Sequence, residues 1–277
     1  MHLRNALKKH ILTIPFHKYQ GTGNDFVLID QREQQYLTRT DQQLIDQLCD
    51  RRFGIGADGL MLLEKKEGFD FEMIYFNADG RESTMCGNGG RCICAFAKKI
   101  GVIETNAYFL AIDGSHHATI NDTGDWVELQ MIDVKQIEQD KNFFVLNTGS
   151  PHYVTFVKDF STLNVFQEGK KIRYNERFAK EGINVNFITP IENGIKVATY
   201  ERGVEDETLS CGTGVTAAAI AFWLSQNNTS LREVSIETKG GSLSVRLQPD
   251  GYIGFKNIWL CGSANNIFKG EIEIAKI

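Results

Sequence analysis

The sequence contains no apolar run long enough to cross a bilayer. Its strongest candidate, residues 215–224, is too short and includes Thr216. The first fifteen residues are basic, but they contain neither a compact apolar stretch nor a small-residue cleavage site, so no secretory signal is expected. We therefore expect a cytoplasmic protein with no membrane partner.

Positive charge is not in excess either. The chain has 30 Lys and Arg against 35 Asp and Glu, which gives a net charge of −5. This balance argues against a nucleic-acid partner and leaves a small polar substrate open. With 277 residues, 42% of them hydrophobic, the chain suits one large domain or two of ordinary size.

The spacing of metal-binding cysteines is also missing. Without an export signal, the six cysteines are expected to be reduced thiols. Cys86, Cys92 and Cys94 leave gaps of five residues and one, unlike the paired CxxC of structural zinc. No lysine motif for pyridoxal phosphate is evident. The sequence therefore predicts neither a metal nor an organic cofactor.

One glycine pattern matches the motif of a dinucleotide-binding site but lies in a different structural context. Residues 54–59, GIGADG, satisfy the dinucleotide fingerprint GxGxxG. That fingerprint requires a strand before it and a helix after it, whereas here a helical pattern precedes and a strand-like run follows. We interpret these residues as a loop.

What the sequence does contain is a repeat. Cys86 opens CGNG and Cys211 opens CGTG; each follows an acidic loop, precedes an Ala-rich run, and lies 125 positions from the other. GTGNDF at 21–26 and NTGSPH at 147–152 match at an offset of 126. Chance similarity of short glycine-containing strings is the alternative, but two markers at a common offset favour duplicated domains. The boundary is expected between residues 134 and 142.

Alternating apolar runs predict more strands than helices. Strands are expected at 70–76, 126–132, 196–200 and 233–238, and helices at 40–52, 87–99 and 212–225, with a weaker helix at 178–181. The absence of steady strand–helix alternation favours an α+β fold, in which an antiparallel-rich sheet packs on one apolar helix per half. The helix at 212–225 is apolar almost all round and should be buried.

The two repeated cysteines stand where a catalytic thiol would be placed. Each is expected at the N-terminus of a helix, where unpaired N–H groups and the helix dipole lower a thiol pKa and can bind a carboxylate. Two such thiols, related by duplication, suit opposite faces of one carbon. Stereoinversion needs that arrangement, because one group removes the α-proton and another returns a proton from the other side. Two buried structural cysteines are the alternative.

Five motifs in order resemble those of the diaminopimelate epimerases, from about Phe16 to the C-terminus. They are GTGNDF at 21–26, FNADG at 76–80, MCGNG at 85–89, YERG at 200–203 and SCGTG at 210–214. The resemblance implies a cytoplasmic isomerase that interconverts LL- and meso-diaminopimelate without pyridoxal phosphate, for lysine and peptidoglycan synthesis, often as a homodimer.

The resemblance also implies two similar domains, each a curved mixed sheet around a central helix, with the active site in the cleft between them. The corresponding division is an extension at 1–15, an N-terminal domain at 16–134 completed by 263–277, and a C-terminal domain at 142–262.

By the same resemblance, particular residues would bind the substrate around Cys86 and Cys211. Asn24, Asn77, Asn184, Glu201 and Arg202 would contact it, and Gly87, Asn88, Gly212 and Thr213 would hold the α-carboxylate. A bidentate clamp on the distal carboxylate suits an arginine. Otherwise, a single Asn is as readily a turn or cap residue, and the Glu–Arg pair a surface ion pair.

His152 is expected near one thiol, where it would tune proton transfer, although a lone histidine is more often structural. Ser150 stands where the family usually has asparagine, which puts the contact with the distal end of the substrate in question at that point.

Two other functions remain open. One is a racemase or isomerase of the same scaffold that acts on proline, hydroxyproline or histidine. Retention of Asn24, Asn77, Asn184 and Arg202 together favours instead a substrate with a second amino-acid head. The other is a non-catalytic amino-acid-binding protein, which would have no need of a pair of acid–base thiols.

Overall fold

The computed structural model describes residues 10–226, 231–251 and 254–276. The N-terminal half contains seven strands and two helices in these residues. They are β1 (His10–Gly21), β2 (Asn24–Asp30), α1 (Gln42–Cys49), β3 (Gly59–Glu64), β4 (Phe71–Asn77), α2 (Gly87–Lys99), β5 (Asn106–Ala111), β6 (Gly114–Ile120) and β7 (Trp126–Gln130).

The C-terminal half follows the same plan. Its elements are β8 (Ile137–Gln139), β9 (Phe143–Asn147), β10 (Pro151–Phe156), α3 (Val165–Arg173), β11 (Asn184–Ile191), β12 (Gly194–Glu201), β13 (Asp206–Thr208), α4 (Gly212–Ser225), β14 (Glu233–Thr238), β15 (Gly241–Asp250) and β16 (Gly254–Ser263), with β17 (Asn265–Lys276) closing the described chain.

Strand pairing repeats between the halves. In the first half β2–β3 and β4–β5 are parallel, while β1–β2, β3–β4, β5–β6 and β6–β7 are antiparallel. In the second, β10–β11 and β12–β14 are parallel, while β9–β10, β11–β12, β14–β15 and β15–β16 are antiparallel. The predicted α+β fold of two duplicated, antiparallel-rich units is therefore confirmed.

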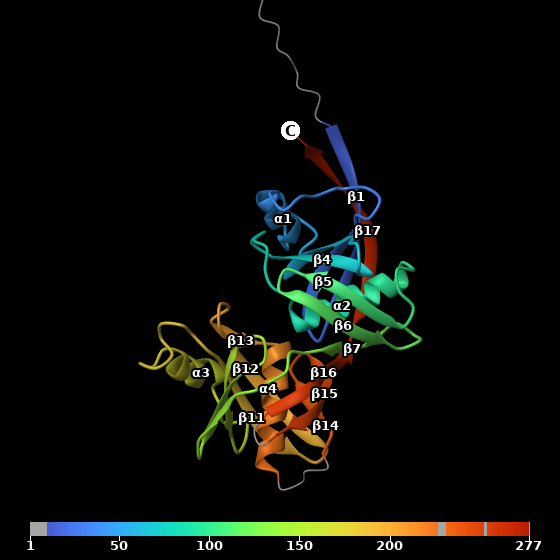
Figure 1. Cartoon of the computed structure of the whole chain (residues 1–277). Coiled ribbons are helices and arrows are strands. Elements are labelled where there is room, and N and C mark those ends of the chain that lie inside the picture. Colours follow the sequence, from blue (N-terminus) through green and yellow to red (C-terminus); the bar gives the residue numbers. More distant parts are fainter. Residues whose placement is uncertain (1–9, 227–230, 252–253, 277) are drawn as a thin grey trace, which may run out of the picture.

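Two strand pairs tie the halves together (Figure 1). β7 pairs antiparallel with β16, with Trp259 opposite Gln130. β17 leaves the C-terminal half and pairs along almost all of β1, from His10 opposite Lys276 to Gln20 opposite Asn265. The extension expected at residues 1–15 needs correcting, because residues 10–15 belong to β1 and are held by these backbone hydrogen bonds. Residues 1–9 lie outside the described residues.

The two Ala-rich helices are the centres of the halves. Every residue of α4 from Val215 to Ala221 is buried, and eleven consecutive residues of α2, from Gly87 to Ala97, are buried as well. Side chains of both helices belong to one apolar cluster that also contains residues from the sheets of both halves. The start of each helix is therefore held within the protein interior, where the two halves meet.

One helix differs from the sequence-based expectation. The weaker helix predicted at 178–181 is wrong, since these residues form hydrogen-bonded turns, with the Gly182 N–H donating to the carbonyl of Phe178. The helix of this region is α3, whose N-cap Asn164 accepts from the Gln167 N–H. Gly169 interrupts its apolar pattern because α3 lies directly on Tyr200: a Cβ at Gly169 would come within 2.4 Å of the Tyr200 Cβ.

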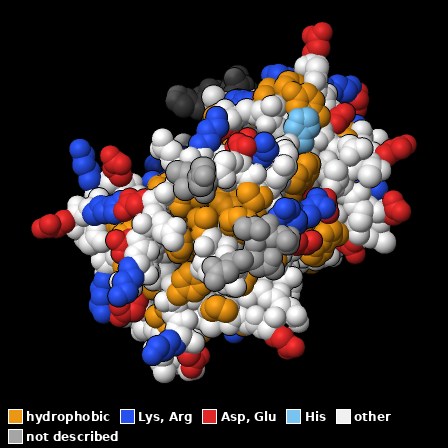
Figure 2. Space-filling view, turned by 60° about the horizontal axis from the view of Figure 1, so that its bottom comes forward, with side chains coloured by type: hydrophobic (Ala, Val, Ile, Leu, Met, Phe, Trp, Pro, Cys, Tyr) orange, Lys and Arg blue, Asp and Glu red, His pale blue; other side chains and the backbone are white. Residues whose placement is uncertain are grey.

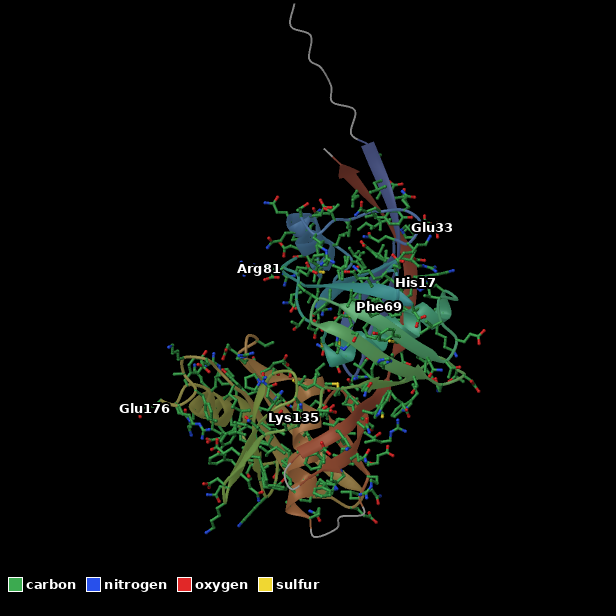
Figure 3. The ribbon with its side chains drawn as sticks, viewed as in Figure 1. His17, Glu33, Phe69, Arg81, Lys135 and Glu176 are labelled. Atoms are coloured by element: carbon green, nitrogen blue, oxygen red, sulfur yellow. The ribbon has the colours of Figure 1, made fainter. Side chains whose placement is uncertain are left out.

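The surface is mixed in charge on the face shown in Figure 2, where both blue and red side chains occur around the margin and hydrophobic side chains lie towards the middle. Lys135, on the connection between β7 and β8, marks the passage from one half to the other (Figure 3). Among the described residues, no helix is both long and apolar enough to span a membrane.

Candidate active site

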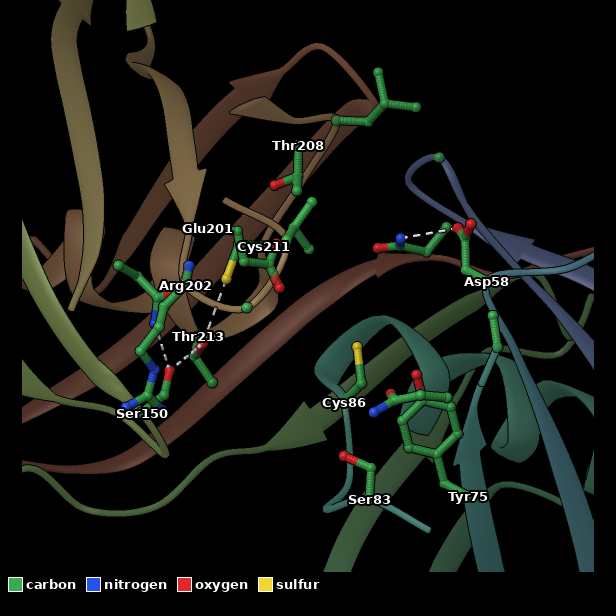
Figure 4. A pocket seen from close by; sticks show the side chains of 18 of the residues that line it. Asp58, Tyr75, Ser83, Cys86, Ser150, Glu201, Arg202, Thr208, Cys211 and Thr213 are labelled. Carbon is green, nitrogen blue, oxygen red and sulfur yellow. Dashed lines mark hydrogen bonds between the residues drawn. The ribbon is translucent and has the colours of Figure 1, made fainter. Parts of the chain in front are cut away.

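A cavity of about 850 Å³ is lined by residues of both halves. Cys86 lines it from the start of α2 and Cys211 from the start of α4, and their sulfur atoms enter it from the two sides (Figure 4). Most of the predicted site residues share this cavity with the thiols: Asn24, Asn77, Ser150, Asn184, Glu201, Arg202 and Thr213. Gly87, Asn88, Gly212 and His152 are buried immediately behind it rather than on its lining.

Each cysteine is the N-cap of its helix. Cys86 has φ −94° and ψ 133°, Cys211 has φ −119° and ψ 114°, and neither helix start is capped by a side chain. The first N–H groups of both helices therefore remain available to a thiolate or a carboxylate. The two helix starts also touch: a Cβ on Gly212 would lie 3.1 Å from the Cα of Gly87.

The predicted lowering of the thiol pKa values is wrong for the structure described. Burial raises the pKa of Cys86, and the nearby Glu201 carboxylate adds to this, while the N–H groups of Gly89 and Asn88 only partly oppose it. Burial also raises the pKa of Cys211 to about 12, again with Glu201 contributing. Loss of hydration thus outweighs the helix N-terminus, because desolvation disfavours any ionised thiol.

A hydrogen-bond chain connects Cys211 to a buried imidazole. Cys211 Sγ lies 3.5 Å from Thr213 Oγ1, which lies 3.1 Å from Ser150 Oγ. Ser150 Oγ in turn lies 2.9 Å from His152 Nε2. The sequence analysis named Thr213, Ser150 and His152 individually; the structure shows that their side chains form one hydrogen-bonded relay to Cys211.

The tautomer of His152 follows from its other neighbour. Asn186 Nδ2 donates to the Tyr153 carbonyl at 3.2 Å, and its Oδ1 accepts from Thr199, which fixes the amide orientation. The same Nδ2 lies 3.0 Å from His152 Nδ1, so Nδ1 accepts and Nε2 carries the proton towards Ser150. Burial, with Arg202 contributing, lowers the pKa of His152 to about 3, which keeps the imidazole neutral.

Asn184 connects this relay to Arg202. Its Nδ2 donates to Ser150 Oγ at 3.0 Å, and its Oδ1 accepts from the Arg202 backbone N–H at 2.9 Å. The guanidinium of Arg202 donates to the Glu181 carbonyl at 3.1 Å and is otherwise exposed at the cavity rim. It is therefore available to an anionic group in the cavity.

The opposite wall carries a second polar network. Asn88 Nδ2 donates to Asn24 Oδ1 at 2.6 Å. Asn24 Nδ2 in turn donates to Asp58 Oδ2 at 3.0 Å, the dashed line that ends at Asp58 in Figure 4. Arg51 pairs with Asp58 at 2.7 Å and with Asp25 at 2.6 Å. Asn24 is thus held from both sides, by Asn88 in the first turn of α2 and by Asp58 in the connection between α1 and β3.

Sequence reasoning missed Asp58, Arg51 and Tyr75, all of which line the cavity. Asp58 lies in the GIGADG segment, which is the predicted loop between α1 and β3. Tyr75 is 8% exposed, and its pKa is raised by burial and by the adjacent Cys86. The GIGADG pattern does not mark Asp58 as a site residue, and all three residues reach the cavity only through the fold.

Solved structures define the class of fold. A phenazine biosynthesis protein of the PhzF family from Bacillus anthracis aligns with a TM-score of 0.73 and 14% identity, over 95% of this chain and 100% of that one. A hydroxyproline epimerase from Agrobacterium vitis with bound trans-4-hydroxy-L-proline aligns with a TM-score of 0.65 and 13% identity, over 98% and 94%. At this level of identity the likeness shows a shared duplicated fold.

Sequence comparison identifies the family. The family model for diaminopimelate epimerase matches residues 16–137 and 144–263. The diaminopimelate epimerase of Flavobacterium psychrophilum is 50% identical over 259 residues, 92% of this chain and 99% of the relative. Those of Aquifex aeolicus and Chlorobaculum tepidum are 37% and 39% identical, each over at least 92% of this chain and 97% of the relative. The chain belongs to the diaminopimelate epimerase family.

Proposed function

We propose that this protein is a diaminopimelate epimerase that interconverts the LL and meso isomers with Cys86 and Cys211 as its acid–base pair and without a cofactor. The observation that carries the proposal is the placement of two thiols, from duplicated helix starts, in one cavity. The name shared by the curated relatives supports the choice of substrate.

In the proposed mechanism one cysteine acts as a thiolate and the other as a thiol. The thiolate takes the α-proton and becomes a thiol, and the second thiol protonates the opposite face of the carbanion and becomes a thiolate. The reaction is therefore balanced without an outside acid or base, and the enzyme is left ready for the reverse direction. Because the α-hydrogen of an amino acid is a very weak acid, positioning and stabilisation of carboxylate charge must lower the barrier.

The α-carboxylate would bind at the two adjoining helix starts. Gly87 and Asn88 offer N–H groups from α2, while Gly212 and Thr213 offer them from α4. Because these helix starts touch, a single carboxylate can receive donors from both halves. The α-carbon would then lie between the two sulfur atoms.

The distal amino-acid head would bind on the exposed side of the cavity. There the Arg202 guanidinium can clamp a carboxylate, and the amide of Asn77, which is exposed at the end of β4, can orient it. Glu201 and Asn184, which line the same cavity, would contact the ammonium and carboxylate groups of the substrate. A monocarboxylic amino acid such as proline would leave Arg202 unused, which favours a substrate with two heads.

We also propose that the enzyme works in the cytoplasm. All six cysteines, each of which lies among the described residues, are free thiols. A mechanism that depends on two neighbouring thiols needs a reducing compartment, since oxidation would remove both the base and the acid.

Exchange in D₂O tests the proposal. The reduced enzyme is incubated with a panel of diaminopimelate isomers, proline, 4-hydroxyproline, histidine and lysine, and deuterium at each α-carbon is measured by mass spectrometry. We expect incorporation and stereoinversion with diaminopimelate alone. Exchange of proline or histidine but not of diaminopimelate would replace the substrate assignment, and no exchange with any amino acid would favour a binding protein.

A further inference from the structure

Arg91, on the second turn of α2, is a cation buried without a counter-charge. It is 0% exposed, and its Nη1 donates to the Gly87 carbonyl at 3.2 Å. Nη2 donates to Thr22 Oγ1 at 2.9 Å and to Asn88 Oδ1 at 3.0 Å, while Nε is buried with no hydrogen-bond partner. Among the described residues, no carboxylate forms an ion pair with it.

A structural role alone would not require the charge. Every acceptor that Arg91 contacts is neutral, and a buried cation without an anion is strongly disfavoured. Strand β16 packs closely over it, since a Cβ on Gly262 would lie 3.2 Å from its Nε. An anion would stabilise a cation in these surroundings, and the described hydrogen bonds of Arg91 supply none.

Burial lowers the pKa of Arg91, and the groups whose ionised forms would oppose this lowering are three thiols, Cys92 first and then Cys86 and Cys261. Cys92 and Cys261 are buried away from the cavity, with pKa values raised to about 12 and about 11. Cys86 is the one of the three that lines the cavity. The anion that Arg91 can serve during a reaction is therefore a Cys86 thiolate.

The duplicated position in the other half supports this assignment. The cysteine offset of 125 places Thr216 of α4 at the position of Arg91. Thr216 is also fully buried, and its Oγ1 donates to the Gly212 carbonyl at 2.9 Å, as Arg91 donates to that of Gly87. The two helices thus share the hydrogen bond to the glycine carbonyl, but only α2 has a positive charge there.

We propose that Arg91 is a positioning residue that makes Cys86 the more readily ionised thiol of the pair, by holding a buried positive charge behind the N-terminus of α2. The inference deepens the proposed function and rests on it for the catalytic meaning of the thiolate. Cys211 is then the thiol that is protonated at the start of the reaction. It has Thr216 behind it and the neutral Thr213–Ser150–His152 relay beside it.

Other charges near the two thiols do not produce this difference. Glu201 raises the pKa of both Cys86 and Cys211, so it acts on the pair in the same direction. Tyr75 is a weak acid whose own pKa is raised further by Cys86, so it stays neutral. Among the residues that the structure describes, Arg91 is the cation that favours ionised Cys86, and none contributes in this way at Cys211.

Alkylation at single cysteines tests the inference without relying on turnover. The full-length enzyme is treated briefly with iodoacetamide across a range of pH, and modification of Cys86 and Cys211 is quantified by peptide mass spectrometry. In Arg91→Met, which removes the charge, we expect the midpoint pH for Cys86 to rise by about one unit or more and that for Cys211 to change little. In Arg91→Lys the Cys86 midpoint should stay close to that of the wild type.

Thr216→Val is the matched control, because it removes the hydrogen bond to the glycine carbonyl of α4 without changing charge. It should leave both midpoints close to those of the wild type. A folded Arg91→Met with an unchanged Cys86 midpoint, or with equal shifts at both thiols, would overturn the inference.

If Arg91→Met does not fold, Arg91→Lys decides the matter. A Cys86 midpoint near that of the wild type supports the role of charge, and a rise of about one unit refutes it. The substrate assignment is tested separately, by the exchange experiment with diaminopimelate, so a failure of that assignment is distinguished from a failure of the inference on Arg91.

Discussion

Gly87 and Gly212 meet at the centre of the molecule: a Cβ on Gly212 would lie 3.1 Å from the Cα of Gly87, and one on Gly87 would lie 3.4 Å from the Cα of Gly212. Both would also come within 3.0 Å of Leu260 Cδ2. The residues are 125 positions apart, as are the cysteines that precede them. Their contact sets the separation of the two helix starts, and with it the separation of the two sulfur atoms.

The first prediction follows from this contact. Gly212→Ala should push the start of α4 away from α2 and cost about 1–3 kcal/mol of unfolding free energy through overpacking. We expect kcat to fall by at least about tenfold, because a displacement near 1 Å is enough to disturb proton transfer. Urea unfolding and epimerisation assays measure the two effects.

Gly89→Ala is the matched control, since it adds the same methyl group in the first turn of α2. There the new Cβ meets Met61 Cε at 2.5 Å, the end of a flexible side chain, and nothing else closer than 3.6 Å. It should retain most of the activity. Equal losses in the two variants would mean that the glycine contact does not set the geometry.

The second prediction concerns the thiols. Cys86→Ser and Cys211→Ser should each lower kcat by at least about 100-fold with the fold intact, because a serine hydroxyl is a far weaker acid than a thiol and is not ionised at neutral pH. Circular dichroism and the epimerisation assay check both points. Cys261→Ser is the control, since Cys261 Sγ contacts the Trp259 carbonyl outside the cavity. Near-wild-type turnover in either catalytic variant removes that cysteine from the mechanism.

The third prediction tests the clamp on the distal carboxylate. Arg202→Lys should raise KM for diaminopimelate by about 30- to 150-fold, corresponding to about 2–3 kcal/mol for a charge-assisted contact, because an ammonium cannot reproduce a bidentate fork. Arg177→Lys, which changes an exposed pair with Glu138, is the control. If KM and kcat are unchanged in Arg202→Lys, Arg202 does not bind the substrate.

The fourth prediction concerns the relay to Cys211. Thr213→Val removes the hydroxyl 3.5 Å from the sulfur while preserving side-chain volume. The hydroxyl opposes the burial that raises the pKa of Cys211, so its loss should raise that pKa further and lower kcat by about tenfold. Alkylation of Cys211 as a function of pH measures the shift. Thr213→Ser keeps the hydroxyl and should restore both properties; failure to do so would point to packing instead.

The fifth prediction links His152 to acid stability. Burial holds its pKa at about 3, below the usual value of 6.5, so the unfolded chain binds a proton there first as pH falls. The contribution of neutral His152 to the free energy of unfolding is complete above pH 6.5. It is lost as the pH falls towards 3, at up to about 1.4 kcal/mol per pH unit. The loss of unfolding free energy in His152→Gln should therefore be smaller at pH 5 than at pH 7, by about 2 kcal/mol.

Urea unfolding at the two pH values makes this comparison, in which the carboxylates common to both proteins cancel. His117→Gln, which removes an exposed imidazole that stacks on Tyr108, is the control. An equal loss at pH 5 and pH 7 in His152→Gln would show that the buried imidazole does not control acid stability.

Local sequence determined the duplication, the two Ala-rich helices and the cysteines at their starts. These features depend on residues close together in the chain, such as the Gly-x-Gly after Cys86 and the apolar run after Cys211, and a shared offset then relates the two halves. The membership of most predicted residues in one cavity also followed from motifs that the chain carries in order.

Tertiary structure alone decided the electrostatics of the site. Burial reverses the expected direction of the thiol pKa shifts, because hydration is lost only when β-strands of both halves enclose the helices. Asp58 reaches the cavity, and the hydroxyl relay reaches His152, only through side chains brought together from distant parts of the chain. In the sequence Arg91 is an ordinary charged residue. Its charge becomes unusual because packing buries it completely and no described carboxylate forms an ion pair with it.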